Sequence, residues 1–437
     1  MPALLKAVRG TRDLLPPETA LWNRVEATAR AVFARYNFGE IRTPILEATE
    51  LFARGVGEET DIVSKEMYTW EDRARAASEK PQSLTLRPEN TAGVVRSYLE
   101  HKLGDTGQLQ KLYYIGPQFR RERPQKGRYR QFFQIGAEVI GPATSGSESP
   151  VRDAEVLEML ATLLDELGIQ RASAANEYKG WKLALNSVGS ATDRPRYVAA
   201  LREALAPIKH LMCEDNQRRA ETNPLRVLDS KEEADQELIN ALPKIADYLD
   251  DDSRAHFAQV LAALDACSVP YQVNPRLVRG LDYYTRTTFE FTVETGLGTQ
   301  NALLGGGRYD GLSEMLGGPK APGIGFAIGE DRLILTLQAQ QVETTPAKLD
   351  AYIAPMGVDQ NPAALALAQE LRKQGLSIEV GDGNFRLKKS FEAADRVARN
   401  ILILGEDEVA TGQITVKNFA TTEQTKVPRE SLAENLR

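Results

Sequence analysis

The sequence predicts an α+β protein in two parts. The larger part is a domain built on an antiparallel sheet and interrupted by a helical insertion, and a small α/β domain with a mostly parallel sheet follows it. Two strand-like segments flank a basic loop between residues 112 and 140, as in an antiparallel pair. A charged stretch at about 193–268 has helical spacing and few strand signals. Beyond residue 348, short apolar strands alternate with helices, which is typical of a parallel sheet.

The first domain is expected to begin with a helix at Pro17–Tyr36, because Leu21, Val25, Ala29 and Val32 are apolar at helical spacing. Its other elements are expected in the following order: a strand Phe38–Ile45 ending at Pro44, strands Leu112–Phe119 and Phe132–Ile140, a helix Arg152–Leu167, the helical insertion, and a strand Thr287–Glu294.

A polar linker between Leu337 and Lys348 predicts the domain boundary, so we expect one domain at 1–337, with its insertion at about 193–268, and a second at 348–437. The second domain is expected to contain, in order, a strand Leu349–Ala354, a helix with Asn361 as N-cap and Pro362 at its first position, a strand Leu376–Val380, a helix running to about Asn400, and a buried strand Ile401–Leu404.

The composition narrows the class of protein. Of the 437 residues, 42% are hydrophobic and 26% charged, which excludes a mostly disordered chain. No stretch approaches the length of about 18 apolar residues that a transmembrane helix needs. Two cysteines exclude a disulfide framework and a cysteine-based zinc site, and the three histidines lie far apart in sequence. These features favour a cytoplasmic enzyme or binding protein without a protein-bound metal or a membrane partner.

The two strands around the basic loop each have a polar face. In the second strand, Gln134, Gly136 and Glu138 alternate with apolar neighbours, so a carboxamide and a carboxylate share one face with a glycine between them. In the first strand, Tyr114 and Gly116 lie on such a face. This pattern favours the floor of a ligand pocket, and the alternative is a sheet surface exposed to solvent.

The basic loop concentrates charge in an acidic protein. Residues 120–130 contain six basic residues and one acidic residue, whereas the net charge of the chain is −7. That balance argues against non-specific coating of nucleic acid and favours one particular anion. The glycine-rich segments Gly305–Gly311 and Gly323–Gly329 match neither the phosphate-loop nor the dinucleotide pattern. A nucleotide would therefore be bound by arginines, for which Arg120, Arg279 and Arg332 are candidates.

Three segments then carry a specific resemblance. Phe38–Glu47 holds a strand followed by proline, Phe119–Glu122 reads Phe-Arg-Arg-Glu between two strands, and Gly329–Arg332 reads Gly-x-x-Arg before a helix. Together they resemble the three motifs of class II aminoacyl-tRNA synthetases. Four further segments are similar to those of the histidyl-tRNA synthetase family: Arg9–Asp13, Leu86–Glu89, Arg123–Phe132 and Leu277–Tyr284.

The resemblance implies a class II catalytic domain, an anticodon-binding C-terminal domain and a histidine–tRNA ligase activity that passes through histidyl-adenylate. It implies ATP as a substrate with Mg²⁺ but no protein metal site, and it implies L-histidine, a histidine-specific tRNA and a second copy of the chain as partners. The residues it implies are Arg120, Arg279 and Arg332 for catalysis, Arg120, Glu122 and Arg332 for ATP, Glu89, Thr91, Gln134, Glu138, Tyr283 and Tyr284 for histidine, and Arg123 and Gln125 for the tRNA acceptor end.

A second function from another class remains possible at this point. A non-catalytic paralogue resembling the regulatory subunit of ATP phosphoribosyltransferase would share the catalytic fold. Such proteins lack the Arg279–Tyr284 segment and usually lack the C-terminal domain, and this sequence has both. The sequence therefore favours the ligase.

Overall fold

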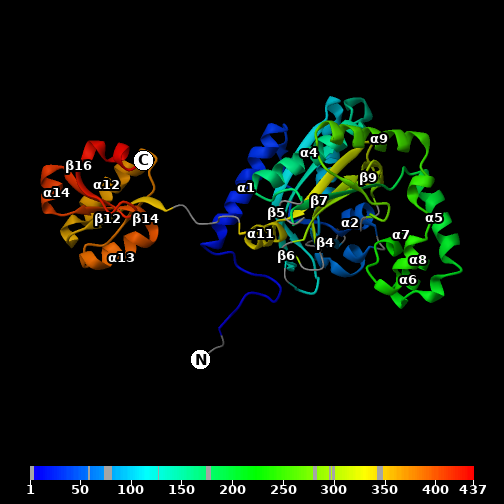
Figure 1. Ribbon diagram of the computed structural model, residues 1–437, viewed down its shortest axis with the longest axis horizontal. Coiled ribbons are helices and arrows are strands. Elements are labelled where there is room, and N and C mark those ends of the chain that lie inside the picture. Colours follow the sequence, from blue (N-terminus) through cyan, green and yellow to red (C-terminus); the bar gives the residue numbers. More distant parts are fainter. Residues whose placement is uncertain are drawn as a thin grey trace. The chain divides into compact units, whose positions relative to one another are not determined.

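The computed structural model describes residues 4–57, 60–72, 81–125, 127–173, 179–278, 283–294, 297, 301–341 and 348–437. The chain divides into two compact units, Met1–Thr344 and Thr345–Arg437 (Figure 1). Among the described residues, no helix is both long and apolar enough to span a membrane.

The first unit is built on an eight-stranded sheet in the order β1-β5-β6-β11-β10-β9-β7-β8. Its strands are β1 (Gly39–Glu40), β5 (Gln110–Phe119), β6 (Gln131–Ile140), β7 (Trp181–Ser187), β8 (Gln272–Val273), β9 (Thr285–Val293), β10 (Ala302–Arg308) and β11 (Gly323–Gly329). The six inner strands are paired antiparallel, whereas the edge strands β1 and β8 each run parallel to their neighbour. The long antiparallel pair predicted around the basic loop is present as β5 and β6.

Four helices supply most of the apolar contacts of one sheet face: α1 (Glu18–Arg35), α4 (Pro150–Glu166), α9 (Asp251–Ala266) and α11 (Glu330–Ala339). The helical spacing of α1 buries Val25, Ala29 and Val32 completely, as the sequence predicts. The same hydrophobic core takes in the apolar face of β6, so the opposite face of β6 is left for polar groups. Three further helices complete the described part of this domain outside the insertion: α2 (Thr49–Val56), α3 (Thr91–Glu100) and α10 (Leu312–Met315).

The predicted continuous strand Phe38–Ile45 is wrong. The ladder of β1 with β5 ends after Glu40, and the last bond runs from the Ile41 amide to the Tyr113 carbonyl oxygen at 2.8 Å. Pro44 has no N–H to continue such a ladder. The chain instead enters a second sheet of order β2-β4-β3, formed by β2 (Leu46–Ala48), β3 (Tyr68–Asp72) and β4 (Gln82–Leu86).

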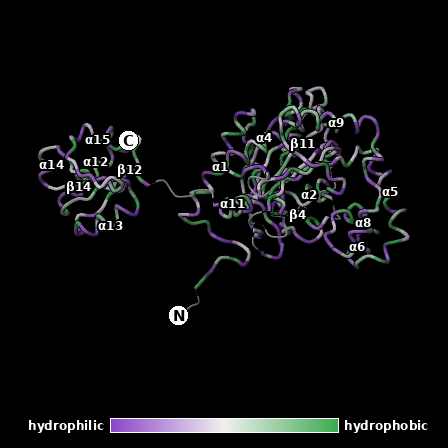
Figure 2. The backbone as a smooth tube through the Cα atoms, viewed as in Figure 1, coloured by the Kyte–Doolittle hydropathy of each residue, from purple (hydrophilic) through white to green (hydrophobic). Residues whose placement is uncertain are grey.

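The helical insertion contains α5 (Asp193–Leu205), α6 (Glu214–Thr222), α7 (Leu225–Leu228) and α8 (Gln236–Asn240). These helices share a small core of their own, and α6 is largely hydrophilic in Figure 2. The expected insertion also took in α9, but Val260 and Leu264 of α9 belong to the main core, and α9 packs on α4. Periodicity alone identified α9 as a helix without revealing which core it serves.

The second unit has a mixed sheet of order β13-β12-β14-β15-β16, so the prediction of a mostly parallel sheet is wrong. The strands are β12 (Leu349–Pro355), β13 (Ile378–Val380), β14 (Ala398–Leu404), β15 (Gln413–Asn418) and β16 (Gln424–Pro428). The first three in the sheet order are parallel, and β15 and β16 add two antiparallel pairings. The sequence does not predict β15 and β16, because polar residues leave no long apolar run in either strand.

The helices of this unit are α12 (Asn361–Lys373), α13 (Leu387–Val397), α14 (Glu406–Thr411) and α15 (Leu432–Asn435). Asn361 is the first residue of α12 rather than its N-cap, which is Gln360. The Asn361 side chain instead accepts a hydrogen bond from the Gly383 amide at 2.8 Å. Helix α13 ends at Val397, before the predicted Asn400, because β14 begins at Ala398 and pairs with β12.

Candidate active site

The polar faces of β5 and β6 lie side by side as the alternation predicts. Tyr114 is paired with Gly136 and Gly116 with Gln134, so these residues share one face of the sheet. The opposite face of β6 contributes Ile135, Ala137 and Val139 to the main core. The pocket-like face is therefore held in place by a packed apolar layer beneath it.

Glu138 lies at the centre of this face with a fully buried side chain. Its Oε1 accepts a 2.8 Å hydrogen bond from the Thr91 hydroxyl, and its Oε2 accepts a 2.7 Å hydrogen bond from the Tyr309 hydroxyl. Burial raises the pKa of Glu138 to about 8, although both hydroxyl groups act in the opposite direction. A carboxylate in this setting suits a ligand that brings its own N–H donor.

Glu89 and Thr91 are placed by the start of α3. The Glu89 carboxylate accepts hydrogen bonds from the Thr91 amide at 2.7 Å and from the Ala92 amide at 3.0 Å. An acidic group at this end of a helix satisfies free amides and complements the helix dipole. Burial raises the pKa of Glu89, and the two backbone bonds oppose the rise. The same turn therefore holds one carboxylate and aims the Thr91 hydroxyl at Glu138.

Tyrosines surround the Glu138 carboxylate. The rings of Tyr283 and Tyr284 are 4.7 Å apart, and the ring of Tyr283 lies 5.9 Å from that of Tyr309. Among the described residues, the Tyr114 hydroxyl and Oε1 of Gln134 are buried without a hydrogen-bond partner. Buried polar atoms of this kind are normally satisfied, so both atoms are available to a bound molecule.

Sequence reasoning missed Tyr309. The glycine-rich segment Gly305–Gly311, which contains this residue, was tested only against the phosphate-loop pattern, and Tyr114 was predicted only as part of a polar face. A polar aromatic residue directly after a glycine-rich strand was the available signal, because such a strand leaves space for a ligand.

The basic side chains gather toward the other end of β6. Arg120 follows β5, its Nε donates to the Pro88 carbonyl oxygen at 2.9 Å, and its guanidinium lies 5.3 Å from the Phe132 ring. Arg332 lies in the first turn of α11, where its Nε donates to the Ala302 carbonyl oxygen at 2.8 Å. Burial lowers the pKa of Arg332, and the nearby Arg128 acts in the same direction.

The register places both arginines at one end of the site. Phe119, directly before Arg120, is paired with Gln131, and Gly329, three residues before Arg332, is paired with Gln134. Both pairings fall within the first four residues of β6. Glu138 is four residues further along, which at about 3.4 Å per residue is about 14 Å from Gln134. The face thus has a carboxylate end and an arginine end.

The basic loop closes on itself as a hairpin. The amide of Gln125 donates to the Arg128 carbonyl oxygen at 3.1 Å, and the amide of Arg128 donates to the Gln125 carbonyl oxygen at 2.9 Å. Glu122 forms an ion pair with Arg128 at 3.1 Å and lies 3.7 Å from Nη1 of Arg120. Arg123 and Gln125 are exposed to solvent. Arg279 and Lys126 lie outside the described residues.

Comparison with known proteins matches two family models to this chain. The first, histidyl-tRNA synthetase, matches residues 10–333, and the second, an anticodon binding domain, matches residues 350–437. A histidine–tRNA ligase from Koribacter versatilis is 68% identical over 435 residues, covering 99% of this chain and 96% of the relative. The chain belongs to the histidyl-tRNA synthetase family. The resemblance inferred from the dispersed motifs is thereby confirmed.

Solved structures agree with this assignment. The apo histidyl-tRNA synthetase of S. aureus is 37% identical, with a TM-score of 0.79, and the match covers 99% of this chain and 100% of the other. A structure described as an ATP phosphoribosyltransferase regulatory subunit/histidyl-tRNA synthetase from Bacillus halodurans has a TM-score of 0.64 at 19% identity, covering 93% of this chain and 99% of the other. At that identity the second match shows only a shared fold.

The described part of the synthetase contains no cluster of three or more His, Cys, Asp or Glu side chains that could hold a metal ion. Members of this family use ATP as a substrate, which carries its own oxygen ligands for a hard cation such as Mg²⁺.

Proposed function

We propose that the carboxylate end of the site selects histidine and that the arginine end activates it with ATP. The overall activity is that of a histidine–tRNA ligase, which follows from family membership and from the 68% identity with a curated ligase across nearly the whole chain. The observation that carries the residue assignment is the buried Glu138, which accepts hydrogen bonds from Thr91 and Tyr309 and lies among buried tyrosines.

In this proposal the ring N–H of histidine donates to Glu138, and Gln134, Glu89, Thr91, Tyr283 and Tyr284 hold the rest of the amino acid. An amino acid without a ring donor would leave the buried carboxyl group unmatched, and polar mismatches of this kind discriminate by roughly 10⁴-fold. The free Oε1 of Gln134 supports its role, because it is an acceptor suited to the α-ammonium group.

The histidine carboxylate then attacks the α-phosphate of ATP, giving histidyl-adenylate and pyrophosphate. Arg120 and Arg332 bind the phosphates, Glu122 contributes to the ATP site through its contacts with Arg128 and Arg120, and Mg²⁺ is held mainly by phosphate oxygens and water. Arg279 lies beside the reacting carboxylate in this proposal. Positioning and charge stabilisation replace a protein nucleophile.

In the second step, the terminal 3′-hydroxyl of the tRNA attacks the activated carbonyl group and releases AMP. Arg123 and Gln125 contact the acceptor end, which their exposure at the hairpin supports. Residues 348–437 contact the anticodon, supported by the anticodon-binding model that matches them. We propose a cytoplasmic homodimer with the catalytic domain at 1–337. The regulatory paralogue is the weaker alternative, because high-identity ligases match both units of the chain.

Pyrophosphate exchange tests this proposal. The pure protein is incubated with ATP, labelled pyrophosphate and each amino acid in turn, and only histidine should drive the label into ATP. Glu138→Gln should remove most of that exchange, because a carboxamide cannot accept from two hydroxyl groups and the imidazole as a carboxylate does. Exchange driven equally by other amino acids, or undiminished exchange by the Glu138 variant, would contradict the proposed pocket.

A further inference from the structure

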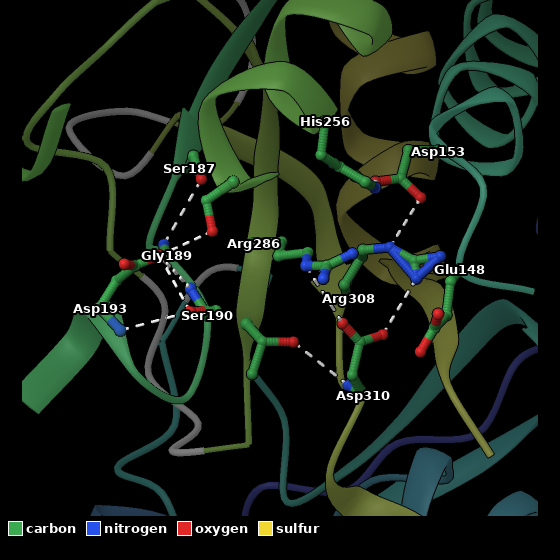
Figure 3. A network of polar contacts seen from close by, with 12 residues as sticks. Glu148, Asp153, Ser187, Gly189, Ser190, Asp193, His256, Arg286, Arg308 and Asp310 are labelled. Carbon is green, nitrogen blue, oxygen red and sulfur yellow. Dashed lines mark hydrogen bonds and ion pairs between the residues drawn. The ribbon is translucent and has the colours of Figure 1, made fainter. Parts of the chain in front are cut away.

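Arg308, the last residue of β10, has a fully buried guanidinium that lies beside Asp153 and Asp310 (Figure 3). Its Nε is 3.1 Å from Oδ1 of the equally buried Asp153 on α4, and its Nη1 is 3.0 Å from Oδ1 of Asp310. Its Nη2 donates to the carbonyl oxygen of Ser147. Among the described residues, Nε of Arg308 and both Asp153 oxygens have no hydrogen-bond partner, so the contact with Asp153 is an ion pair by distance. The hydrogen bonds to Asp310 and Ser147 hold the rest of the buried guanidinium in place.

Tyr309, the neighbouring residue, contacts the pocket. Its hydroxyl donates to Glu138 at 2.7 Å, and its amide donates to the Gly323 carbonyl oxygen at 2.9 Å. Asp310 on its other side is held by Arg308, by Thr285, whose hydroxyl accepts from the Asp310 amide at 3.2 Å, and by Arg286 at 3.8 Å. Both residues that flank Tyr309 are therefore anchored by the same ionic cluster.

The ladder is irregular on the β9 side of this point, whereas on the β11 side the pairing is regular through Arg308. The register of β10 with β9 shifts between Gly307 and Arg308, so the strands form a bulge immediately before Tyr309. Arg286 in the opposing strand has φ of 49°, in the left-handed region that side chains other than glycine seldom adopt. Bulges re-aim side chains next to active sites. The Arg308 ion pairs therefore add to the Tyr309–Gly323 backbone bond and to the packing of the buried Tyr309 ring in holding the direction of its hydroxyl.

We infer that Arg308 and Asp153 are positioning residues for histidine selection, because their buried ion pair holds the Tyr309 hydroxyl on the Glu138 carboxylate. This inference rests on the proposed function, in which Glu138 binds the imidazole. Loss of the ion pair leaves the Tyr309 side chain present, but the orientation of its hydroxyl toward Glu138 is no longer fixed. A buried hydrogen bond that is lost in this way changes affinity by roughly 10- to 100-fold, and the change falls on histidine rather than on ATP.

The test is a double-mutant cycle in the full-length protein, with pyrophosphate exchange as the assay. The variants are Tyr309→Phe, the charge-removing pair Arg308→Met with Asp153→Leu, and all three changes together. Replacing both charges avoids a lone buried carboxylate. We expect the charge-removing pair to raise the KM for histidine about 10-fold or more, to leave the KM for ATP unchanged, and to cause no further rise when Tyr309 is already Phe.

A matched control replaces a surface ion pair between α1 and α4, with Arg35→Met and Glu166→Leu, and should leave both KM values unchanged. If the charge-removing pair does not fold, Arg308→Lys takes its place. Lysine keeps the positive charge but lacks the guanidinium that contacts both Asp153 and Asp310, so the same rise in the KM for histidine is expected.

Additive losses in the cycle, or equal changes in the KM values for histidine and ATP, would show a general structural role and overturn the inference. The inference would also be overturned if Tyr309→Phe raised the KM for histidine while the charge-removing pair, or Arg308→Lys, left that KM normal. If Tyr309→Phe and Glu138→Gln both left the KM for histidine unchanged, the proposed pocket itself would fail.

Discussion

Gly325 on β11 faces Glu138 on β6, and the missing side chain of Gly325 is the space that the Glu138 carboxylate fills. The two residues are paired across the antiparallel ladder. A Cβ at position 325 would lie 1.7 Å from Oε2 of Glu138 and 2.8 Å from the Ala137 carbonyl oxygen. One of these contacts is to backbone, so moving the carboxylate alone would not remove the crowding. Glycine is required here by the pocket rather than by a turn.

Gly325→Ala should therefore abolish selective activation of histidine. The added methyl group pushes the carboxylate away from the hydroxyl groups of Thr91 and Tyr309. A displacement of about 1 Å at a reacting group costs about 10²-fold in rate, so histidine-dependent pyrophosphate exchange should fall by at least about that factor. Steady-state exchange at saturating ATP measures it.

Gly311→Ala is the matched control, because no atom other than those of its chain neighbours lies within 4 Å of a Cβ at that glycine. Its exchange rate should equal that of the unchanged protein. A Gly325→Ala variant with a normal rate and a normal KM for histidine would contradict the placement of the pocket.

Glu330 is another buried carboxyl group, and among the described residues neither of its oxygens has a hydrogen-bond partner. Burial raises its pKa to about 9, and the neighbouring Glu26 acts in the same direction. The folded state therefore keeps a proton that the unfolded state releases above its ordinary pKa of 4.5. Stability contributed by this group is present at low pH and is lost as the pH rises toward 9, by up to about 1.4 kcal/mol for each pH unit.

Glu330→Gln should remove this dependence on pH. Relative to the unchanged protein, the variant should gain free energy of unfolding between pH 6 and pH 8, because glutamine has no proton to release. Guanidinium titrations of both proteins at the two pH values measure the difference. The exposed Glu314→Gln serves as the control and should show no such gain. An equal difference at both pH values would show that Glu330 is not protonated in the folded chain.

Local sequence patterns predicted which residues of β6 share one face at the site, but not which residues reach that face from other strands. Alternation along β6 placed Gln134 and Glu138 on one face correctly, because the side-chain period of a strand needs no knowledge of its partners. Tyr309, directly after β10, and Gly325, on β11, both reach Glu138 from more than 170 residues further along the chain. Long-range pairings of this kind leave no periodic signal, and the glycine-rich segments of these strands match neither nucleotide-binding pattern, so the sequence gives no sign of their role beside Glu138.

The lack of a local signal for long-range pairing also explains the errors in the predicted fold. The segment before Pro44 has strand-like composition, yet its ladder stops at Glu40 and the chain changes sheets. In the second unit, β15 and β16 form a hairpin whose outer strand is mostly exposed. Neither outcome follows from local propensity, because packing against distant segments decides strand membership.

Gln125→Ala should separate activation from transfer. Gln125 lies at the exposed end of the basic hairpin, whereas Arg120 lies on the sheet, so the substitution should leave pyrophosphate exchange unchanged. Glutamine can read a base edge, and we expect histidine transfer to tRNA to fall by about tenfold, equivalent to about 1.4 kcal/mol. Aminoacylation with labelled histidine measures it. Equal loss of both activities would place Gln125 in the ATP site.

The segment around Pro44 carries the prediction of a homodimer. It forms edge strands in two sheets, since β1 is at the edge of the eight-stranded sheet and β2 at the edge of the three-stranded one. Ile45 and Leu46 next to these edges are 40% and 49% exposed, and a cavity of about 510 Å³ lined by residues including Arg42, Pro44 and Leu46 adjoins them. Open edges and exposed apolar side chains together favour a protein partner.

Leu46→Glu should therefore dissociate the dimer, because a carboxylate placed in an apolar interface lacks a partner. Light scattering at micromolar concentration should report twice the chain mass of 48.3 kDa for the unchanged protein and a single chain mass for the variant. Val273→Glu is the matched control, since Val273 is 45% exposed on β8 at the opposite edge of the same large sheet, and its variant should remain dimeric. A monomeric unchanged protein would contradict the prediction outright. Dissociation by Val273→Glu but not by Leu46→Glu would instead move the interface to the β8 edge.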